Sequence, residues 1–497
     1  MAQPIVQVTE GQLAGRAASD DVSAFLGIPF AAPPLGEKRW RPPAPPAAWQ
    51  GVRSAGEFAP SCPQPMSPTG FGPWSSEYVV QGVTAEDCLY LNVWAPAPGF
   101  AKLPVMVWIH GGAFLGGSGS VPIYEGAPLA TQGLVVVTIN YRLGALGFLA
   151  HPDLTAETGS SGNYGLMDQI AALQWVQQNI DAFGGDPTQV TIAGQSAGAL
   201  SVLALLEAPP AKGLFARAIA QSGAGLNLPI PSLAAAETAG RSFAEAKGAK
   251  TIADLRALPV DQLIAAPNPG AGGDEPLLQF VPIHDGKLLS EKASALADVP
   301  LMTGLTADEG SGFNPLYGRM TLSQFQTQVR KDYGSMGDEL LGLYPAATDA
   351  EARLASLQLT RDRGVAATLL WLEHRAPEVR APAYAYLYDH AEPGHDAERF
   401  AAFHSSELPY VFKTLDKAPR PFTDRDHALA NLMSSYWVNF IRGGDPNGSG
   451  LPAWPLYQAG HGDVMELGDH PGVQQIDSRK YEFFRRYSQG GGLVSLF

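Results

Sequence analysis

The sequence is poor in cysteine, in charge and in long apolar runs, and each shortage excludes a class of protein. Its 497 residues include two cysteines, which without a Cys-x-x-Cys spacing or a neighbouring histidine pair cannot form a zinc site. The formal net charge is -15, so the chain lacks the basic surface with which proteins bind nucleic acid or anionic membranes. No apolar run approaches the roughly twenty residues that span a bilayer. A small-molecule partner is therefore expected.

Two further absences concern processing and domain organisation. The first residues lack the basic and apolar regions of a signal peptide, so such a segment was either never present or has been removed. Cys62 and Cys88 flank a Pro/Gly/Ser-rich stretch, and they form either a disulfide that closes a surface loop or two separate buried thiols. The chain is 45% hydrophobic and 16% charged, and no linker, charge block or repeat divides it. We expect one globular domain over residues 1–497.

Four short apolar runs are typical of buried strands: residues 103–109, 134–139, 190–193 and 216–221. They are continuously apolar rather than alternating, as in parallel strands that are covered on both faces. Residues 167–180 place apolar side chains near a period of about 3.6, which predicts a crossover helix. This order of strands and helices predicts an α/β fold.

Two Ala-rich stretches, residues 231–267 and 322–379, predict additional helices. Within the first, Thr251 and Asp254 have the spacing of a helix N-cap and its partner before Leu255. We expect these segments to cover the strand ends and to wall the functional site.

The stretch Val190-Thr-Ile-Ala-Gly-Gln-Ser-Ala-Gly-Ala199 is the most informative part of the chain. An apolar run breaks here into Gly-x-Ser-x-Gly, the sequence form of a nucleophile elbow. Gly194 and Gly198 leave room for a sharp turn that lifts the hydroxyl of Ser196 clear of the backbone. The following helix directs its positive end at the reaction centre. A serine held in this way predicts covalent acyl transfer.

Acyl transfer also requires donors for the oxyanion and a base that is oriented by an acid. Trp108-Ile-His-Gly-Gly-Ala-Phe114 follows an apolar run and is similar to the glycine-rich oxyanion loops of esterases. We predict the backbone N–H groups of Gly112, Ala113 and Ala197 as the donors. His110, in the same loop, is better suited to a structural hydrogen bond than to the role of base.

The residues alone leave the acid undecided, because Asp308 and Glu309 are adjacent at the end of an apolar run. Among ten histidines, His404 has the most suitable setting, between an apolar approach and an aromatic loop, with His390 and His395 as alternatives. The order serine, acid, histidine is that of the α/β-hydrolases.

Further motifs occur in order at residues 27–43, 86–93, 140–144, 163–169 and 183–187. With these motifs the chain resembles, over essentially its whole length, the type-B carboxylesterases, an esterase and lipase family related to the cholinesterases. The resemblance implies an α/β-hydrolase fold with a large, mostly parallel sheet, flanking helices and helical insertions over an active-site gorge.

The resemblance also assigns roles to individual residues. It favours Glu309 over Asp308 as the acid, identifies His404 as the base, and makes Ser222 a second serine that supports the acid. It implies a structural salt bridge between Arg39 and Glu86. It further implies that Cys62 and Cys88 form a disulfide, which favours a secreted or periplasmic location, although a cytoplasmic one stays open.

The expected function is that of a serine carboxylesterase, which hydrolyses small-molecule esters through an acyl-enzyme on Ser196 and needs no metal or organic cofactor. The alternatives are a lipase or amidase with the same triad, or a cholinesterase-like interaction domain with little activity. We expect a monomer or homodimer without a membrane span. The predicted pocket walls are aromatic: Trp74, Phe114, Phe313, Tyr317 and Phe412.

Overall fold

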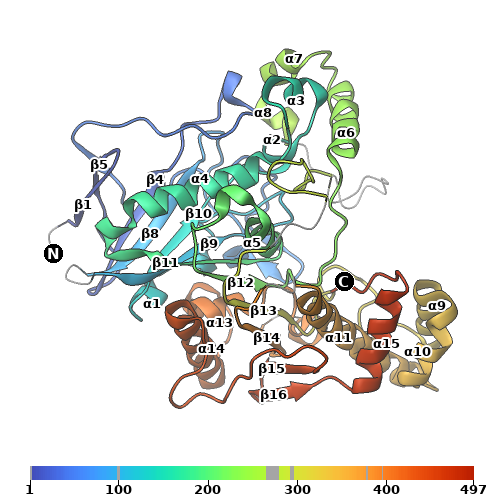
Figure 1. Cartoon of the computed structure of the whole chain (residues 1–497). Helices are drawn as coiled ribbons and strands as arrows, with labels where there is room; N and C mark the ends of the chain where they lie inside the picture. The colour runs from blue at the N-terminus through green and yellow to red at the C-terminus, as the bar shows by residue number, and fades with distance from the viewer. Residues whose placement is uncertain are drawn as a thin grey trace. The chain divides into compact units, whose positions relative to one another are not determined.

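The computed structural model describes residues 3–97, 101–264, 279–291, 296–375, 379–394 and 396–496 (Figure 1). The chain divides into two compact units. The first comprises Met1–Ile219 and Pro229–Ala297, and the second comprises Ala220–Leu228 and Asp298–Phe497. A single domain over the whole chain stays a prediction.

Buried strands form the centre of the first unit. Strand β9 (Leu103–Ile109) pairs in parallel with β10 (Val135–Ile139) on one side and with β11 (Gly185–Gln195) on the other. Antiparallel β8 (Tyr90–Pro96), β4 (Val22–Pro29) and β3 (Arg16–Ala17) continue the sheet beyond β10. All residues of β10 are buried, in agreement with the apolar pattern.

The four predicted strands are confirmed; β10 and β12 each begin one residue later than predicted, and β11 is longer at both ends. Strand β9 spans the predicted residues, and the fourth apolar run forms β12 (Arg217–Gln221). Strand β11 begins at Gly185 rather than Val190, because a register shift between these residues adds a polar segment that periodicity does not reveal. The other strands of the first unit are short: β1 (Ile5–Val8), β2 (Gly11–Ala14), β5 (Val52–Ser54), β6 (Gly70–Phe71) and β7 (Trp74–Ser75).

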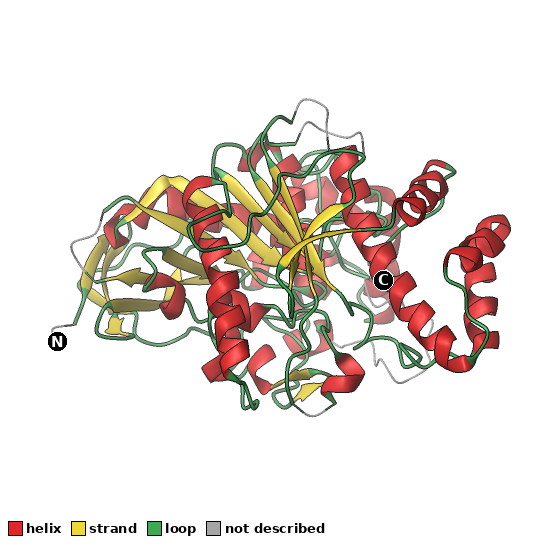
Figure 2. Cartoon of the chain, turned by 90° about the horizontal axis from the view of Figure 1, so that it is seen from below, coloured by secondary structure: helices red, strands yellow, loops and turns green. Residues whose placement is uncertain are grey.

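Helices flank these strands, as the red helices beside the yellow strands in Figure 2 illustrate. Helices α4 (Tyr164–Asn179) and α5 (Ala197–Glu207) pack on β11, and α1 (Ala127–Ala130) packs on β8 and β10. The predicted crossover helix is therefore α4, which begins at Tyr164 rather than Met167. The other helices of this unit are α2 (Gly144–Phe148), α3 (Pro152–Thr158), α6 (Leu233–Ala246), α7 (Ile252–Ala257) and α8 (Val260–Leu263).

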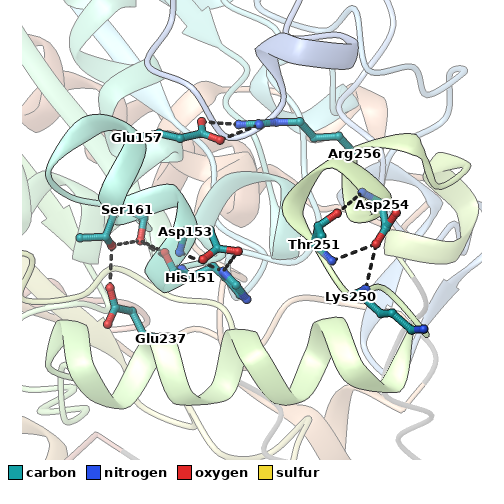
Figure 3. Close-up of polar contacts among 10 residues, drawn as sticks. His151, Asp153, Glu157, Ser161, Glu237, Lys250, Thr251, Asp254 and Arg256 are labelled. Carbon is teal, nitrogen blue, oxygen red and sulfur yellow. Dashed lines mark hydrogen bonds and ion pairs between the residues drawn. The ribbon is translucent and has the colours of Figure 1, made fainter.

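The capping signal at Thr251 is confirmed (Figure 3). The Asp254 N–H donates to Thr251 Oγ1 at 3.1 Å, and the Thr251 N–H donates to Asp254 Oδ2 at 2.9 Å. Arg256 of the same helix then reaches α3, where both oxygens of Glu157 accept its guanidinium N–H groups at 2.8 Å. Residues 265–267 of the predicted helical stretch lie outside the described residues.

The second unit combines a smaller set of paired strands with long helices. Strand β14 (Ala383–Tyr388) pairs in parallel with β13 (Leu301–Thr306) and β15 (Asp463–Leu467), and β16 (Gly472–Gln475) is antiparallel to β15. The predicted helical stretch 322–379 contains the first three helices of this unit; its residues 376–378 lie outside the described residues. The helices of the second unit are α9 (Leu322–Tyr333), α10 (Gly337–Leu343), α11 (Asp349–His374), α12 (Ala397–Phe400), α13 (Leu408–Phe412), α14 (Asp424–Gly443) and α15 (Ser478–Gln489).

Two pairings implied by the resemblance are present in the first unit. Cys62 and Cys88 form a disulfide, and both residues are buried. Arg39 and Glu86 form an ion pair with an Nη2 to Oε1 distance of 2.5 Å. Among the helices of the described residues, none has both the length and the apolar character needed to cross a bilayer.

Candidate active site

Ser196 lies at the turn between β11 and α5 and has a backbone conformation that is rare for a residue with a side chain. Its φ is 57° and its ψ is -125°. Residues Gly194 to Ala199 are otherwise buried, whereas Ser196 is partly exposed. Such strain is found where the surrounding structure imposes it, typically at functional sites. The turn thus leaves Ser196 partly exposed at the end of a buried strand.

The two glycines of the motif are required by packing. A Cβ on Gly194 would lie 2.5 Å from the backbone of Gly198, and a Cβ on Gly198 would lie 2.0 Å from the carbonyl oxygen of Ile109. Both contacts involve backbone atoms, which cannot rotate away. The sharp turn and the close approach of α5 to β9 therefore depend on the absence of side chains at these positions.

The loop that follows β9 has an unusual backbone at all three positions from 112 to 114. Gly112 has φ 106°, Ala113 has φ 56° and Phe114 has φ 59°. The carbonyl oxygen of Gly112 accepts the N–H groups of Leu115 and Gly116 at 2.9 and 3.0 Å. Among the described residues, neither Gly112 nor Ala113 donates its N–H to another backbone carbonyl. This loop therefore combines a closed turn with two N–H groups that no backbone carbonyl of the described residues accepts.

Ala197 adds a donor of a different kind. It is the first residue of α5, and the first N–H groups of a helix have no acceptor within the helix. The positive end of the helix dipole lies at the same place. In the first unit, the predicted nucleophile is thus adjacent in sequence to one predicted oxyanion donor.

In the second unit, His404 and Glu309 form a buried pair. His404 is 4% exposed, and its Nδ1 contacts Glu309 Oε2. The other carboxylate oxygen, Oε1, accepts the backbone N–H of Thr306 at 2.8 Å. The Glu309 carboxylate is therefore held at both oxygens. The aromatic ring of Phe313 lies 5.7 Å from the His404 ring, measured between centroids.

Asp308, the adjacent carboxylate, has other partners. It accepts hydrogen bonds from Tyr317 Oη at 2.9 Å and from Arg361 Nη2 at 2.9 and 3.1 Å. It also accepts the N–H of Ala402 at 3.2 Å. Arg361 and Ala402 lie 53 and 94 positions from Asp308, so the residues alone did not distinguish the two acids. Arg361 is a member of this cluster that the sequence analysis missed.

Of the other histidines considered, His390 and His110 form hydrogen bonds with groups other than Glu309, and His395 is not among the described residues. His390 contacts Asp469 Oδ1 through Nδ1 at 2.7 Å and Asp426 Oδ1 through Nε2 at 2.9 Å. His110 contacts the carbonyl oxygen of Gly111 through Nδ1 at 2.8 Å, and burial lowers its pKa to about 4. His395 lies outside the described residues.

Ser222 is fully buried and has φ 53°. Its N–H donates to the carbonyl oxygen of Gly304 at 2.8 Å. Its hydroxyl has no hydrogen-bond partner within the part of the chain that the structure describes. The role of Ser222 in supporting Glu309 stays a prediction.

The predicted pocket residues have different environments. Phe313 is 54% exposed beside His404, whereas the Tyr317 hydroxyl is bonded to Asp308. Phe412 is fully buried in α13. In the first unit, Phe114 is buried against Phe148 with a centroid distance of 5.1 Å, and Trp74 is buried against Phe71. A substrate pocket walled by these rings stays a prediction.

Glu407 is a buried carboxyl group that the sequence analysis did not consider, although it lies three positions after His404. Its Oε1 accepts the side-chain amide of Gln221 at 3.1 Å, and its Oε2 has no partner among the described residues. Gln221 in turn accepts the indole N–H of Trp437 at 3.1 Å. Burial, together with the charge of Glu309, raises the pKa of Glu407 to about 7.

This raised pKa predicts a dependence of stability on pH. Because the pKa of Glu407 rises from 4.5 to about 7 on folding, the folded state favours the protonated form. The resulting stabilisation is present below pH 4.5 and is lost as the pH rises through 7, a change of about 3 kcal/mol. Glu407→Gln should remove this pH-dependent contribution to the free energy of unfolding. Urea unfolding of wild type and variant at pH 5 and pH 8 measures this contribution. An equal change of the unfolding free energy between the two pH values in both proteins would contradict the prediction.

Comparisons with known proteins show which family the chain matches. The model of the carboxylesterase family matches residues 2–484. Fumonisin B1 esterase of Sphingopyxis macrogoltabida is 38% identical, over 91% of this chain and 84% of that protein. Para-nitrobenzyl esterase of Bacillus subtilis is 36% identical, over 92% of this chain and 93% of its own.

A solved structure of a PNB esterase is similar, with a TM-score of 0.78 and 33% identity, and the match covers 97% of this chain and all of that one. This similarity confirms the α/β-hydrolase fold that the resemblance implied. From the family match over nearly its whole length and from these relatives, we conclude that the chain belongs to the carboxylesterase family.

Proposed function

We propose that this carboxylic ester hydrolase acts through Ser196 as the nucleophile, His404 as the base and Glu309 as the acid that orients it. The observation that carries the proposal is the strained turn at Ser196, with φ 57°, between a buried strand and a helix N-terminus. Such strain requires support from the surrounding fold, here the close packing at Gly194 and Gly198. The contact between His404 and Glu309 supplies the second part of the argument.

In the proposed reaction, Ser196 Oγ attacks the ester carbonyl carbon while His404 Nε2 takes up the hydroxyl proton. The negative charge that develops on the carbonyl oxygen is stabilised by the N–H groups of Gly112, Ala113 and Ala197. The alcohol leaves with the proton from His404, and an acyl-enzyme remains. Water then repeats the attack and releases the acid. Loss of one oxyanion donor typically costs about 3–4 kcal/mol of transition-state stabilisation.

Glu309 has the geometry to hold the correct tautomer of His404. Thr306 N–H and His404 Nδ1 each contact one carboxylate oxygen, so the carboxylate cannot turn without losing a hydrogen bond. With a proton on Nδ1, the ring nitrogen that can take up the serine proton is Nε2. The negative charge of Glu309 would then stabilise the imidazolium that forms.

The substrates we propose are small esters with an apolar acyl or alcohol group. The half-exposed ring of Phe313 beside His404 offers apolar contact surface. We further propose a secreted or periplasmic location, because disulfides such as Cys62–Cys88 persist in oxidising compartments. A monomer or homodimer that does not bind nucleic acid is in keeping with the net charge of -15.

Covalent labelling tests the proposal directly. A fluorophosphonate that reacts with activated serines should modify the folded protein at Ser196 and leave heat-denatured protein unmodified, as measured by peptide mass spectrometry. The unlabelled protein should hydrolyse p-nitrophenyl acetate and butyrate.

Other outcomes of these assays separate the alternatives. Preference for p-nitrophenyl decanoate or for emulsified triglyceride indicates a lipase, and cleavage of p-nitroanilides indicates an amidase. A folded protein that neither turns over these substrates nor takes the label would support an interaction domain and contradict the proposal.

A further inference from the structure

The loop closed by the disulfide contains a buried glutamine that bonds to the loop between β9 and α1. Gln64 lies two positions after Cys62 and is 5% exposed. Its Oε1 accepts the N–H of Gly117 at 2.7 Å, and its Nε2 donates to the carbonyl oxygen of the same residue at 2.8 Å. Nε2 also donates to the carbonyl oxygen of Cys62 at 3.0 Å. One amide thus satisfies both backbone polar groups of Gly117 and links them to the disulfide.

We call residues 110–117 the oxyanion loop. Gly117, at the end of this loop, packs directly on its first two residues, His110 and Gly111. Its φ is 105°, and a Cβ at this position would lie 2.3 Å from His110 Nδ1 and 2.5 Å from the Gly111 carbonyl oxygen. These two atoms are hydrogen-bonded to each other at 2.8 Å. A displacement of Gly117 would therefore disturb the peptide group that joins Gly111 to Gly112, whose N–H is a proposed oxyanion donor.

Next to this contact, the residues that follow Gly117 are held by other side chains. Ser118 Oγ accepts the hydroxyl of Ser61 at 2.8 Å, and the N–H of Gly119 donates to Asn140 Oδ1 at 2.9 Å. The amide of Asn140 also reaches the carbonyl oxygen of Cys88 at 3.1 Å. The residues that follow the oxyanion loop are thus bonded to Ser61, next to Cys62, and through Asn140 to Cys88. Gln64 bonds to Gly117 itself.

We propose that Gln64 is a positioning residue for ester hydrolysis, which holds the Gly112 and Ala113 donors in place by pairing with both backbone groups of Gly117. This inference rests on the proposed function. A rigid loop is needed because oxyanion donors stabilise the transition state only when they are aligned before the reaction. Gln64 does not touch the substrate and acts through the backbone of the loop.

Gln64→Met tests the proposal, because methionine has a similar length and flexibility but cannot pair with Gly117. We expect kcat for p-nitrophenyl butyrate to fall about 10- to 100-fold while KM changes less than about threefold, since a small misplacement of catalytic groups can cost this much. The inhibition constant of an apolar trifluoromethyl ketone, whose adduct carries an oxyanion, should rise by a similar factor.

Gln177→Met is the matched control. Gln177 is also partly buried and donates to two backbone carbonyl oxygens, those of Pro187 at 2.7 Å and Leu214 at 2.9 Å, but it lies on α4. This variant should lose stability without a change in kcat or in ketone affinity beyond about threefold. Equal kcat and equal ketone affinity in the two variants would overturn the proposal.

Gln64→Glu provides a second test if Gln64→Met does not fold. A protonated carboxyl can accept the Gly117 N–H and donate one hydrogen bond to a carbonyl oxygen, whereas an ionised one faces the carbonyl oxygens of Gly117 and Cys62 without a proton to donate. The activity of this variant relative to wild type should therefore rise as the pH is lowered from 9 to 6. Burial lowers the pKa of His110, whose ring packs on Gly117, to about 4, so this side chain should stay neutral in this range. A ratio near one at all pH values would also overturn the proposal.

Ser196→Ala separates the two hypotheses. If this variant retains activity, the proposed function itself has failed. If it is inactive while Gln64→Met behaves like Gln177→Met, only the inference about Gln64 has failed.

Discussion

Replacement of Ser196 by alanine is expected to lower kcat for p-nitrophenyl butyrate by about a million-fold. Without Oγ no acyl-enzyme can form, and neither the oxyanion donors nor His404 can compensate for the missing nucleophile. The variant should fold, since alanine has a Cβ like serine and meets the same strain at φ 57°. Stopped-flow and long-term assays with the purified variant measure the residual rate.

Ser201→Ala is the matched control for this experiment. Ser201 lies on the same helix, where its hydroxyl donates to the carbonyl oxygen of Ala197 at 3.0 Å and accepts the amide of Gln169 at 3.0 Å. Its loss should lower the free energy of unfolding by about 1 kcal/mol and change kcat by less than tenfold. A folded Ser196→Ala variant with more than about a hundredth of wild-type activity would refute the assignment of the nucleophile.

Glu309→Gln is expected to lower kcat by about 10⁴-fold through the wrong tautomer of His404. The N–H of Thr306 requires an oxygen as its acceptor, so the amide oxygen of the new side chain should take the place of Oε1. The amide nitrogen would then face His404 Nδ1, which must become an acceptor, and the imidazole proton moves to Nε2. Nε2 can no longer accept the serine proton. Steady-state kinetics and the pH profile of kcat/KM measure the loss.

Asp308→Asn is the natural comparison, because it removes the neighbouring carboxylate. Asp308 is bonded to Arg361 and Tyr317 instead of His404, so this variant should lose about 1–3 kcal/mol of stability. Its kcat should fall far less than that of Glu309→Gln. Equal losses of kcat in the two variants would show that Glu309 has no special role.

Much of the fold follows from the sequence because its signals are local. The continuous apolar runs predicted β9, β10, β11 and β12, since a strand buried on both faces needs apolar side chains on both sides. The capping pair of Thr251 and Asp254 could also be predicted from the sequence, because both hydrogen bonds join residues within one helical turn. The start of β11 at Gly185 could not be predicted, because it depends on a register shift in the sheet rather than on periodicity.

The elbow was also determined by the sequence, because Gly194, Ser196 and Gly198 act through the sterics of one short turn. The residues alone left the acid open and the resemblance favoured Glu309, and the tertiary structure shows that Glu309 contacts His404. Only the tertiary structure shows which backbone groups Gln64 binds. Asp308 and Glu309 are adjacent and chemically similar, and His404 lies 95 positions from Glu309. Gln64 and Gly117 are 53 positions apart. Steric rules operate over a few residues, whereas hydrogen-bond partners are chosen when distant segments pack and buried polar groups must be satisfied.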